Sequence, residues 1–510
     1  MRINKKISGV ILLCIILLTV LVFVLVLVSC QKEQNGENTK TNNENKTDES
    51  QKNNDNPVDN NSILFPEGDY DFEGYNFRVL INGPDHGDYE SKEIYAEGDT
   101  GEVLNDAVRK RNIQIEDKYN FKISVNNNAK WGEIPTIAKK LILAGSDEYD
   151  MIMPMINDAA PLAHDKLIMN LNALPGLNLS APWWDQRAND QLSIYNKLYF
   201  TTGDIGVLDK YCTFVTFFNK TLVADLGLEN PYELVNSGNW TQDKVSEFIK
   251  GASKDLNGDA MMDYNDRWGL LTDTSIPMAM FFGSGEHITK KTPDGGLEIT
   301  ILNERSQNVL NNAFKFIYDK ANVIFAEELK SSHATVWDAA SAVFAENRAL
   351  FRMCALIGVN EKITVSSEIN FGILPQPKFN KEQAEYNNFV STLGVPGVCV
   401  PITCGNPERT GVIIDAFARY ADKTVRHAFY DIILNNRLIR DTESGEMLDI
   451  IFKTRTYDLG VIYNFGTLRD MFYNMASKRN ENFVSECEKR MPKATKELSA
   501  ILEKYASIEE

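Results

Sequence analysis

Oxygen-bearing side chains recur through the stretch 255–266, which reads DLNGDAMMDYND. With the first Asp as position 1, side-chain oxygens fall at positions 1, 3, 5, 9 and 12, and a backbone carbonyl is available at position 7. A hard cation such as Ca²⁺ takes about six to eight oxygen ligands, which a short loop of this kind can supply. The sequence therefore predicts a structural Ca²⁺ site formed by Asp255, Asn257, Asp259, Met261, Asp263 and Asp266.

This loop resembles the calcium loops of EF-hand and dockerin proteins, with two departures. Position 6 is Ala260, where those loops have a glycine for the sharp turn, and position 12 is Asp266, where EF-hands use Glu. An acidic surface turn that binds no metal is the alternative interpretation.

Catalytic motifs are absent from the sequence. It contains no GxGxxG, P-loop, GxSxG or HExxH pattern, and its five histidines are widely scattered. A pair of carboxylates meeting in a cleft, as in glycoside hydrolases, leaves no local pattern and stays open as an alternative. We expect a protein that is not an enzyme.

The N-terminal sequence predicts an export signal that ends at a cysteine. Arg2 and two lysines precede an apolar stretch that runs, with one threonine, to Val28, and Ser29 and Cys30 follow. This order is typical of a secretory signal. Its end resembles the lipobox of bacterial lipoproteins, which implies cleavage after residue 29 and lipidation of Cys30. The alternative is an uncleaved helix, because the stretch approaches the ~20 residues that span a bilayer.

Both alternatives place the remainder of the chain outside the cytoplasm, since the positive end stays inside. We expect the extracellular face of the cell membrane, of the Gram-positive type. Residues 30–64 are predicted to be a disordered tether, because ten of the 32 residues in 31–62 are Asn and Val58 is the one aliphatic residue there. Loss of the signal would change the formal net charge from −18 to −21, which argues against nucleic acid as a partner.

Five cysteines remain after the signal and Cys30: Cys212, Cys354, Cys399, Cys404 and Cys487. An odd number cannot all pair, and three of them lie in apolar strings where a free thiol behaves as a small hydrophobe. A Cys399–Cys404 disulfide stays open. A zinc site is disfavoured because the sequence has no CxxC motif.

The folded part begins near residue 65 and is too long for one ordinary core, so we expect two lobes. Strand-like runs at 75–81, 121–125 and 149–153 alternate with amphipathic stretches at 102–120 and 134–144. This β-α-β-α-β order is typical of an α/β protein with a doubly wound sheet.

The order of several segments resembles the extracellular solute-binding proteins of ABC importers, in the family that includes maltose-binding protein. The segments are EYDMIMPMINDAAPLAHDKLIMNLN, the Phe218-Asn219-Lys220 triplet, SGNWTQDKVSEFIKGASK, FAENRALFRMCAL, INFGILPQPKF, LGVPGVCVPITCGNPERTGVIIDAFARYA and RDTESGEMLDIIFKTRTYDLG. They run in order over about 400 residues, as in that family.

The resemblance implies a two-lobed periplasmic-binding-protein-like fold of type II, in which each lobe has a mostly parallel sheet flanked by helices. The N-terminal lobe would comprise residues 65–208 and 366–423, and the C-terminal lobe residues 209–365 and 424–510. It further implies a monomer that closes over a solute between its lobes and passes the solute to permease subunits.

Candidate ligand-binding residues follow from this arrangement. Polar groups should line the carboxyl ends of strands, and aromatic rings should cover the C–H faces of a sugar. Each candidate has a packing or surface role as its alternative. They are Asn157, Asp158, Asp204, Lys210, Tyr211, Arg352 and Met353, with the tryptophans Trp183, Trp184 and Trp337.

Carbohydrate is the favoured solute. A receptor for peptides or polyamines, a surface glycan-degrading enzyme, and a sensor or adhesion lipoprotein without a permease remain as alternatives.

Overall fold

The computed structural model describes residues 69–359, 367–435 and 442–507. All of them belong to the compact unit formed by residues 63–510. The predicted signal peptide, Cys30 and tether lie outside the described residues. Within the described ranges, no helix combines the length and apolar character needed to cross a bilayer.

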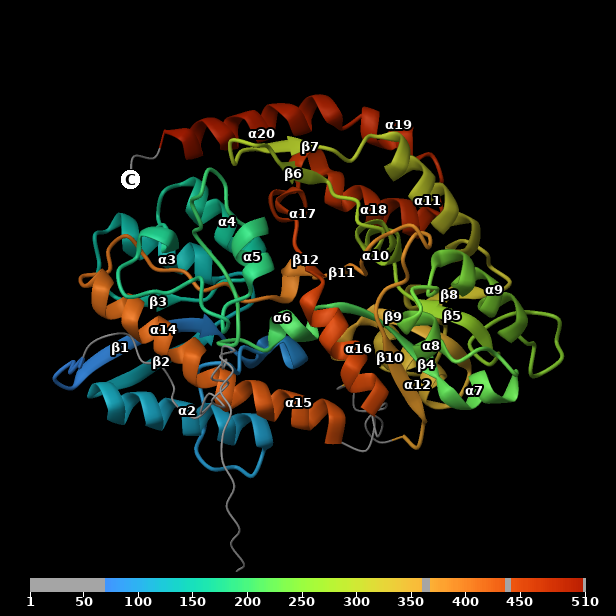
Figure 1. Cartoon of the computed structure of the whole chain (residues 1–510), viewed down its shortest axis with the longest axis horizontal. Helices are drawn as coiled ribbons and strands as arrows, with labels where there is room; N and C mark the ends of the chain where they lie inside the picture. Colours follow the sequence, from blue (N-terminus) through green and yellow to red (C-terminus); the bar gives the residue numbers. More distant parts are fainter. Residues whose placement is uncertain (1–68, 360–366, 436–441, 508–510) are drawn as a thin grey trace, which may run out of the picture. The chain divides into compact units, whose positions relative to one another are not determined.

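The first sheet is parallel and has the order β2-β1-β3. Its strands and the helices that connect them are β1 (Tyr75–Asn82), α2 (Val103–Tyr119), β2 (Phe121–Ala129), α3 (Ile134–Leu143) and β3 (Met151–Ile152). The predicted β-α-β-α-β order is therefore confirmed (Figure 1).

Both faces of β1 are buried, which explains its run of apolar residues. Val79 packs in one apolar cluster with Ile115 of α2. Leu80 faces the other way, into a second cluster with Ile134 of α3. Successive side chains of a strand point to opposite faces, so a continuous apolar strand needs helices on both sides. The helices α14 (Pro407–Lys423) and α4 (Ile156–His164) complete the two layers.

The second sheet is mixed and has the order β10-β4-β9-β5-β8. β5 runs parallel to β8 and β9, whereas β4 runs antiparallel to β9 and β10. The strands are β4 (Phe214–Asn219), β5 (Trp268–Thr272), β8 (Val323–Phe325), β9 (Ala349–Ala355) and β10 (Phe371–Leu374). The boundary predicted at residue 366 assigns β10 to the N-terminal lobe, but its pairing with β4 places it in the second sheet.

The Trp-Thr pair at residues 240 and 241 starts one of the helices around this sheet. The hydroxyl of Thr241 accepts a hydrogen bond from the Lys244 amide, which satisfies a backbone donor at the helix start. Trp240 is fully buried and donates its indole N–H to the Pro375 carbonyl at 2.9 Å. The helices of this lobe are α7 (Lys220–Asp225), α8 (Pro231–Asn236), α9 (Gln242–Ala252), α10 (Ile276–Gly283), α11 (Glu304–Ile317), α12 (Val336–Ala345) and α16 (Thr442–Lys453).

Short elements and the C-terminal helices complete the fold. A parallel two-stranded pair joins β11 (Asn388–Phe389) to β12 (Arg455–Thr456), and an antiparallel pair joins β6 (Thr289–Lys291) to β7 (Leu297–Ile299). The remaining helices are α5 (Gln186–Gln191), α6 (Leu208–Tyr211), α15 (Val425–Asn435), α17 (Leu459–Tyr463), α18 (Leu468–Lys478), α19 (Phe483–Glu488) and α20 (Met491–Ala506). The short 3₁₀ helices include η1 (Pro84–Tyr89) and η5 (Thr392–Gly394). All five cysteines in the described ranges are free thiols.

Candidate functional site

Each of the two sheets has an edge where parallel strands end together. In the first sheet β1 ends at Asn82, and β3 ends at Ile152 just before α4. In the second sheet β5 ends at Thr272 beside the end of β8, and the parallel strand β9 ends at Ala355. Ligands of open α/β sheets bind outside the carboxyl ends of the strands. These two edges are therefore the candidate site.

Two crossing segments join the carboxyl edges. The first runs from residue 203, in the first lobe, to Phe214 at the start of β4. The second returns from Phe389 to Pro396, which bridges to Met155 beside β3. The segments are bonded to one another, because the Ser391 amide donates to the Cys212 carbonyl at 2.9 Å. The two edges thus lie at opposite ends of the same pair of crossings.

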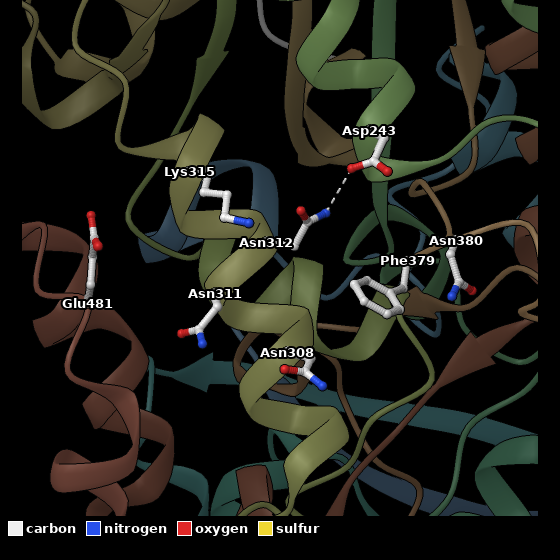
Figure 2. A pocket seen from close by; sticks show the side chains of 8 residues that line it. All are labelled: Asp243, Asn308, Asn311, Asn312, Lys315, Phe379, Asn380 and Glu481. Carbon is white, nitrogen blue, oxygen red and sulfur yellow. Dashed lines mark hydrogen bonds between the residues drawn. The ribbon is translucent and has the colours of Figure 1, made fainter.

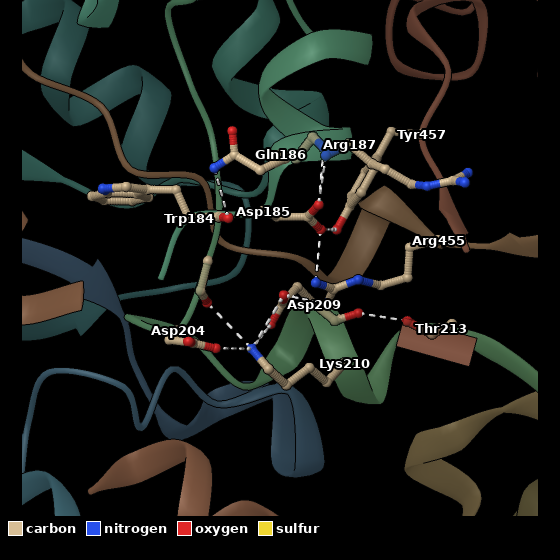
Figure 3. A network of polar contacts seen from close by, with 12 residues as sticks. Trp184, Asp185, Gln186, Arg187, Asp204, Asp209, Lys210, Thr213, Arg455 and Tyr457 are labelled. Atoms are coloured by element: carbon tan, nitrogen blue, oxygen red, sulfur yellow. Dashed lines mark hydrogen bonds and ion pairs between the residues drawn. The ribbon is translucent and has the colours of Figure 1, made fainter. Parts of the chain in front are cut away.

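A buried network of charges surrounds the first crossing segment (Figure 3). The Arg455 guanidinium of β12 lies 2.8 Å from Asp185 and 2.6 Å from Asp209. Asp185 caps α5 in the first lobe, and Asp209 belongs to α6 in the crossing. Tyr457 adds a hydroxyl hydrogen bond to Asp185 at 2.8 Å. One cation therefore ties the crossing segment to the first lobe and to the C-terminal part of the chain.

The predicted ligand residues Asp204 and Lys210 belong to this network. The Lys210 ammonium lies 3.3 Å from Asp209 and 3.6 Å from Asp204, and it donates to the Gly206 carbonyl at 3.0 Å. Burial raises the pKa of Asp204, although Lys210 and Arg426 act in the opposite direction. Tyr211 is buried against the ring of Phe429 at 4.9 Å between centroids. A ligand role for these residues stays a prediction.

A second polar group lies where α4 begins. With its amide oriented to suit both neighbours, Asn157 donates to the Thr392 hydroxyl at 2.6 Å and accepts from Arg469 at 2.8 Å. The next residue, Asp158, is half-buried, and this burial raises its pKa. The residues that the structure describes give its carboxylate no hydrogen-bond partner. Asp158 is thus a partly desolvated hydrogen-bond acceptor, and its ligand role stays a prediction.

The second lobe contributes Asp273, which directly follows β5. It is buried and accepts a hydrogen bond from the Ser275 amide at 2.8 Å, and burial raises its pKa to about 6. Helix α18 brings the two edges together, because Arg469 contacts Asn157 and Tyr473 lies one turn further along the helix. Burial and, to a lesser extent, the charge of Asp273 raise the pKa of Tyr473 to about 12.

These residues are called the edge group below: Asn157, Asp158, Asp273, Thr392, Arg469 and Tyr473. The group combines an amide, a guanidinium, two hydroxyls and two carboxylates whose charged forms are disfavoured by burial. Such an array offers both donors and acceptors to a polar solute. Asn157 and Asp158 were predicted from the sequence. Asp273 could have been found by the same rule, since it also follows a strand, whereas Arg469 and Tyr473 carry no local signal.

The predicted tryptophans occupy different surroundings. The indole N–H groups of Trp183 and Trp184 both donate to Asp415 of α14, at 3.0 and 3.2 Å, and Arg419 lies over the Trp183 ring. Trp337 lies in the first turn of α12 and is 46% exposed.

The two candidates on β9 are buried. Arg352 lies 3.3 Å from the Ser341 hydroxyl, and Met353 packs in the apolar core. The roles of these five residues in ligand binding stay predictions.

The loop at 255–266 connects α9 to the start of β5, and Asp273 follows the other end of that strand. Ala260 adopts the left-handed conformation with φ 63°, so the chain makes the sharp turn there without a glycine. The Asp255 carboxylate accepts from two loop amides, at 2.6 and 2.9 Å, and Asp266 accepts from two others. Among the described residues, no three His, Cys, Asp or Glu side chains converge as metal ligands. The backbone turn is compatible with the predicted calcium loop. The loop carboxylates, however, accept from backbone amides and would have to rotate to contact a cation.

Comparison with known proteins identifies the fold. No family model and no curated protein sequence matches the chain. A solved cyclo/maltodextrin-binding protein complexed with maltotetraose is similar, with a TM-score of 0.54 and 15% identity over 85% of this chain and 98% of that chain. This likeness confirms the predicted fold, a two-lobed α/β fold of the periplasmic-binding-protein type.

Two further solved structures resemble the chain at a TM-score of 0.49 and 12% identity, each over 85% of this chain. One is an ABC substrate-binding protein from Listeria monocytogenes in complex with cycloalternan, matched over 99% of its length. The other is the GacH receptor of Streptomyces glaucescens, matched over 97% of its length.

Replacing Arg455 by Leu should strongly destabilise the protein. The substitution leaves Asp185 and Asp209 buried without their shared cation, and breaking a buried ion pair costs about 3–5 kcal/mol. The matched control is Arg426→Leu, because Arg426 is 40% exposed at the rim of the same network and such pairs contribute about 0–1 kcal/mol. Thermal denaturation of both variants measures the difference. Equal losses in the two variants would contradict a central role for Arg455.

Proposed function

We propose that the protein is a receptor that captures a carbohydrate between its two lobes and passes it to the permease of an ABC importer. The observation that carries the proposal is the edge group, in which α18 joins Asn157 of the first lobe to the region of Asp273 in the second. The fold supports the same function, because the similar cyclo/maltodextrin-binding protein holds maltotetraose.

The chemistry of the edges suits a sugar. Sugar hydroxyls both donate and accept, so a carboxylate, an amide and a guanidinium in one place can each hold one. An aromatic pair supports this reading: Tyr89, which ends η1 after β1, contacts Trp131, which follows β2, with 6.1 Å between ring centroids. Both rings are half-buried at the carboxyl edge of the first sheet. Rings in this position can cover the C–H faces of a sugar.

The transport role adds a membrane anchor and a moving hinge. Closure of two lobes about crossing strands buries the solute and creates a surface that a permease can recognise. Lipidation of Cys30 would keep the receptor beside that permease on the outer face of the membrane. The proposal of an anchor rests on the N-terminal sequence.

Saturable binding of a neutral oligosaccharide by the full chain is the first expected outcome. Isothermal titration should be run with panels of oligosaccharides, peptides and polyamines, and the solute should be recovered intact. Asp158→Asn and Arg469→Met should each weaken binding at least tenfold, about 1.4 kcal/mol, because each removes one charged hydrogen-bond partner.

The control is Asp165→Asn, at the exposed end of the same helix α4, which should bind normally. An affinity that is unchanged in both edge-group variants would contradict the proposed site. Cleavage of the sugar would instead favour an enzyme, with Asp273 as its acid because its raised pKa keeps part of the carboxyl protonated near pH 6.

We also propose that Ca²⁺ binds the loop 255–266 as a structural ion. Extracellular calcium modules bind with Kd values of about 10⁻⁴–10⁻³ M, so millimolar Ca²⁺ should raise the melting temperature and EGTA should lower it. Asp255→Ala should abolish this dependence, whereas Asp225→Asn on the exposed side of α7 should retain it. A melting temperature that is the same in Ca²⁺ and EGTA would count against the site.

Lipidation of Cys30 is tested by labelling with an alkyne fatty acid in a bacterial host. The wild-type chain should take up the label and sediment with membranes, whereas Cys30→Ser should lose the label. The serine variant matches the cysteine in size but cannot form the thioether. A mature protein that still begins at Met1 and carries no label would favour the uncleaved helix.

A further inference from the structure

A polar groove lies on the second lobe, outside the edge group (Figure 2). Its volume is about 690 Å³, within the range of about 300–1,000 Å³ that is typical of ligand pockets. It is lined by α9, α11, the segment after β10 and the loop before α19. None of its lining residues belongs to the edge group; they are Asp243, Asn308, Asn311, Asn312, Lys315, Phe379, Asn380 and Glu481.

One face of α11 supplies half of this lining. Residues 308, 311, 312 and 315 follow the i, i+3, i+4, i+7 spacing, which places them on one side of the helix. The opposite side is apolar and packs into the core through Val309, Leu310 and Ala313. The polar face is therefore turned outward as one continuous strip.

Asparagine is an unexpected choice for this strip. A solvent-facing helix gains from Glu, Lys or Gln, whereas Asn ranks low because its amide competes for backbone groups. Three asparagines on one exposed face work against the helix that carries them.

The groove is completed by an aromatic ring and by fixed amides. Phe379 is half-buried across from Asn308 and Asn312, and the Arg305 guanidinium lies over its ring at 5.5 Å from the centroid. The Asn312 amide donates to Asp243 at 3.2 Å, which orients it. The Asn380 side-chain oxygen accepts from the Gln383 backbone N–H at 3.2 Å, and within the described part of the chain its N–H₂ group makes no hydrogen bond.

We propose that this groove is a second binding site for a neutral oligosaccharide. Amides donate and accept at once, as sugar hydroxyls do, and the ring offers a face to C–H groups. Asp243, Glu481 and Lys315 leave the lining with little net charge, which does not favour a strongly ionic ligand. The proposal goes beyond capture between the lobes and does not depend on it.

Saturation-transfer NMR tests the groove on the full chain with a panel of neutral gluco-, xylo-, manno- and galacto-tetrasaccharides. The experiment is run in the Arg469→Met background, in which binding between the lobes is expected to be weak. The binding that remains then reports on the groove, and the two sites are tested separately. The double variant Asn308→Ala, Asn311→Ala should weaken binding of at least one tetrasaccharide tenfold or more. Its melting temperature should stay the same or rise, because Ala is the better helix former.

Phe379→Leu should weaken binding of the same sugar, because it removes the aromatic ring. Gln307→Ala is the control, because Gln307 is exposed on α11 outside the groove. The proposal is overturned if no tetrasaccharide loses affinity in the Asn308, Asn311 variant, or if Gln307→Ala has an equal effect. It is also overturned if the groove variants change only the association with a protein partner.

Discussion

The buried cation of Arg455 ties the first lobe to the crossing segment that leads to the second sheet. Its guanidinium is shared by Asp185 of the first lobe and Asp209 of the crossing segment, and the strand β12 that carries it pairs with β11. Burial of three charges is costly, and apolar residues of similar volume often serve stability equally well. We infer that the network is retained for geometry, since it fixes where the chain leaves one sheet and enters the other.

The position of the edge group follows from that constraint. The crossing segments run between the carboxyl ends of the two sheets, and α18 lies beside both ends, with Arg469 at Asn157 and Tyr473 near Asp273. Two side chains of the crossing, Lys210 and Tyr211, are engaged in contacts within the protein. The residues that we propose for solute binding lie beside the crossing, where burial raises the pKa of both Asp158 and Asp273. In the proposed receptor, the residues that hold the crossing and the residues that bind the solute are thus neighbours but not the same.

Local patterns predicted the elements of the first sheet well. The strand at 75–81 and the helices α2 and α3 form where the apolar spacing predicted them, because each buries a regular face. The same patterns could not show that β10 joins the second sheet, since strand pairing depends on partners more than 150 residues away. For the site, Asn157 and Asp158 could be predicted from the sequence because they follow a strand. Arg469 was not, because a residue on a late helix meets them only through the tertiary fold.

Closure of the lobes is measured most directly by pulsed electron resonance between spin labels at the two carboxyl edges. Lys130→Cys after β2 and Lys330→Cys after β8 place the labels on exposed positions, and the native cysteines are mostly buried. If the protein is a two-lobed receptor, the distance distribution should shift to shorter values when a sugar that binds is added. Arg469→Met should remove this shift. A distribution that is unchanged at saturating sugar would contradict capture by lobe closure.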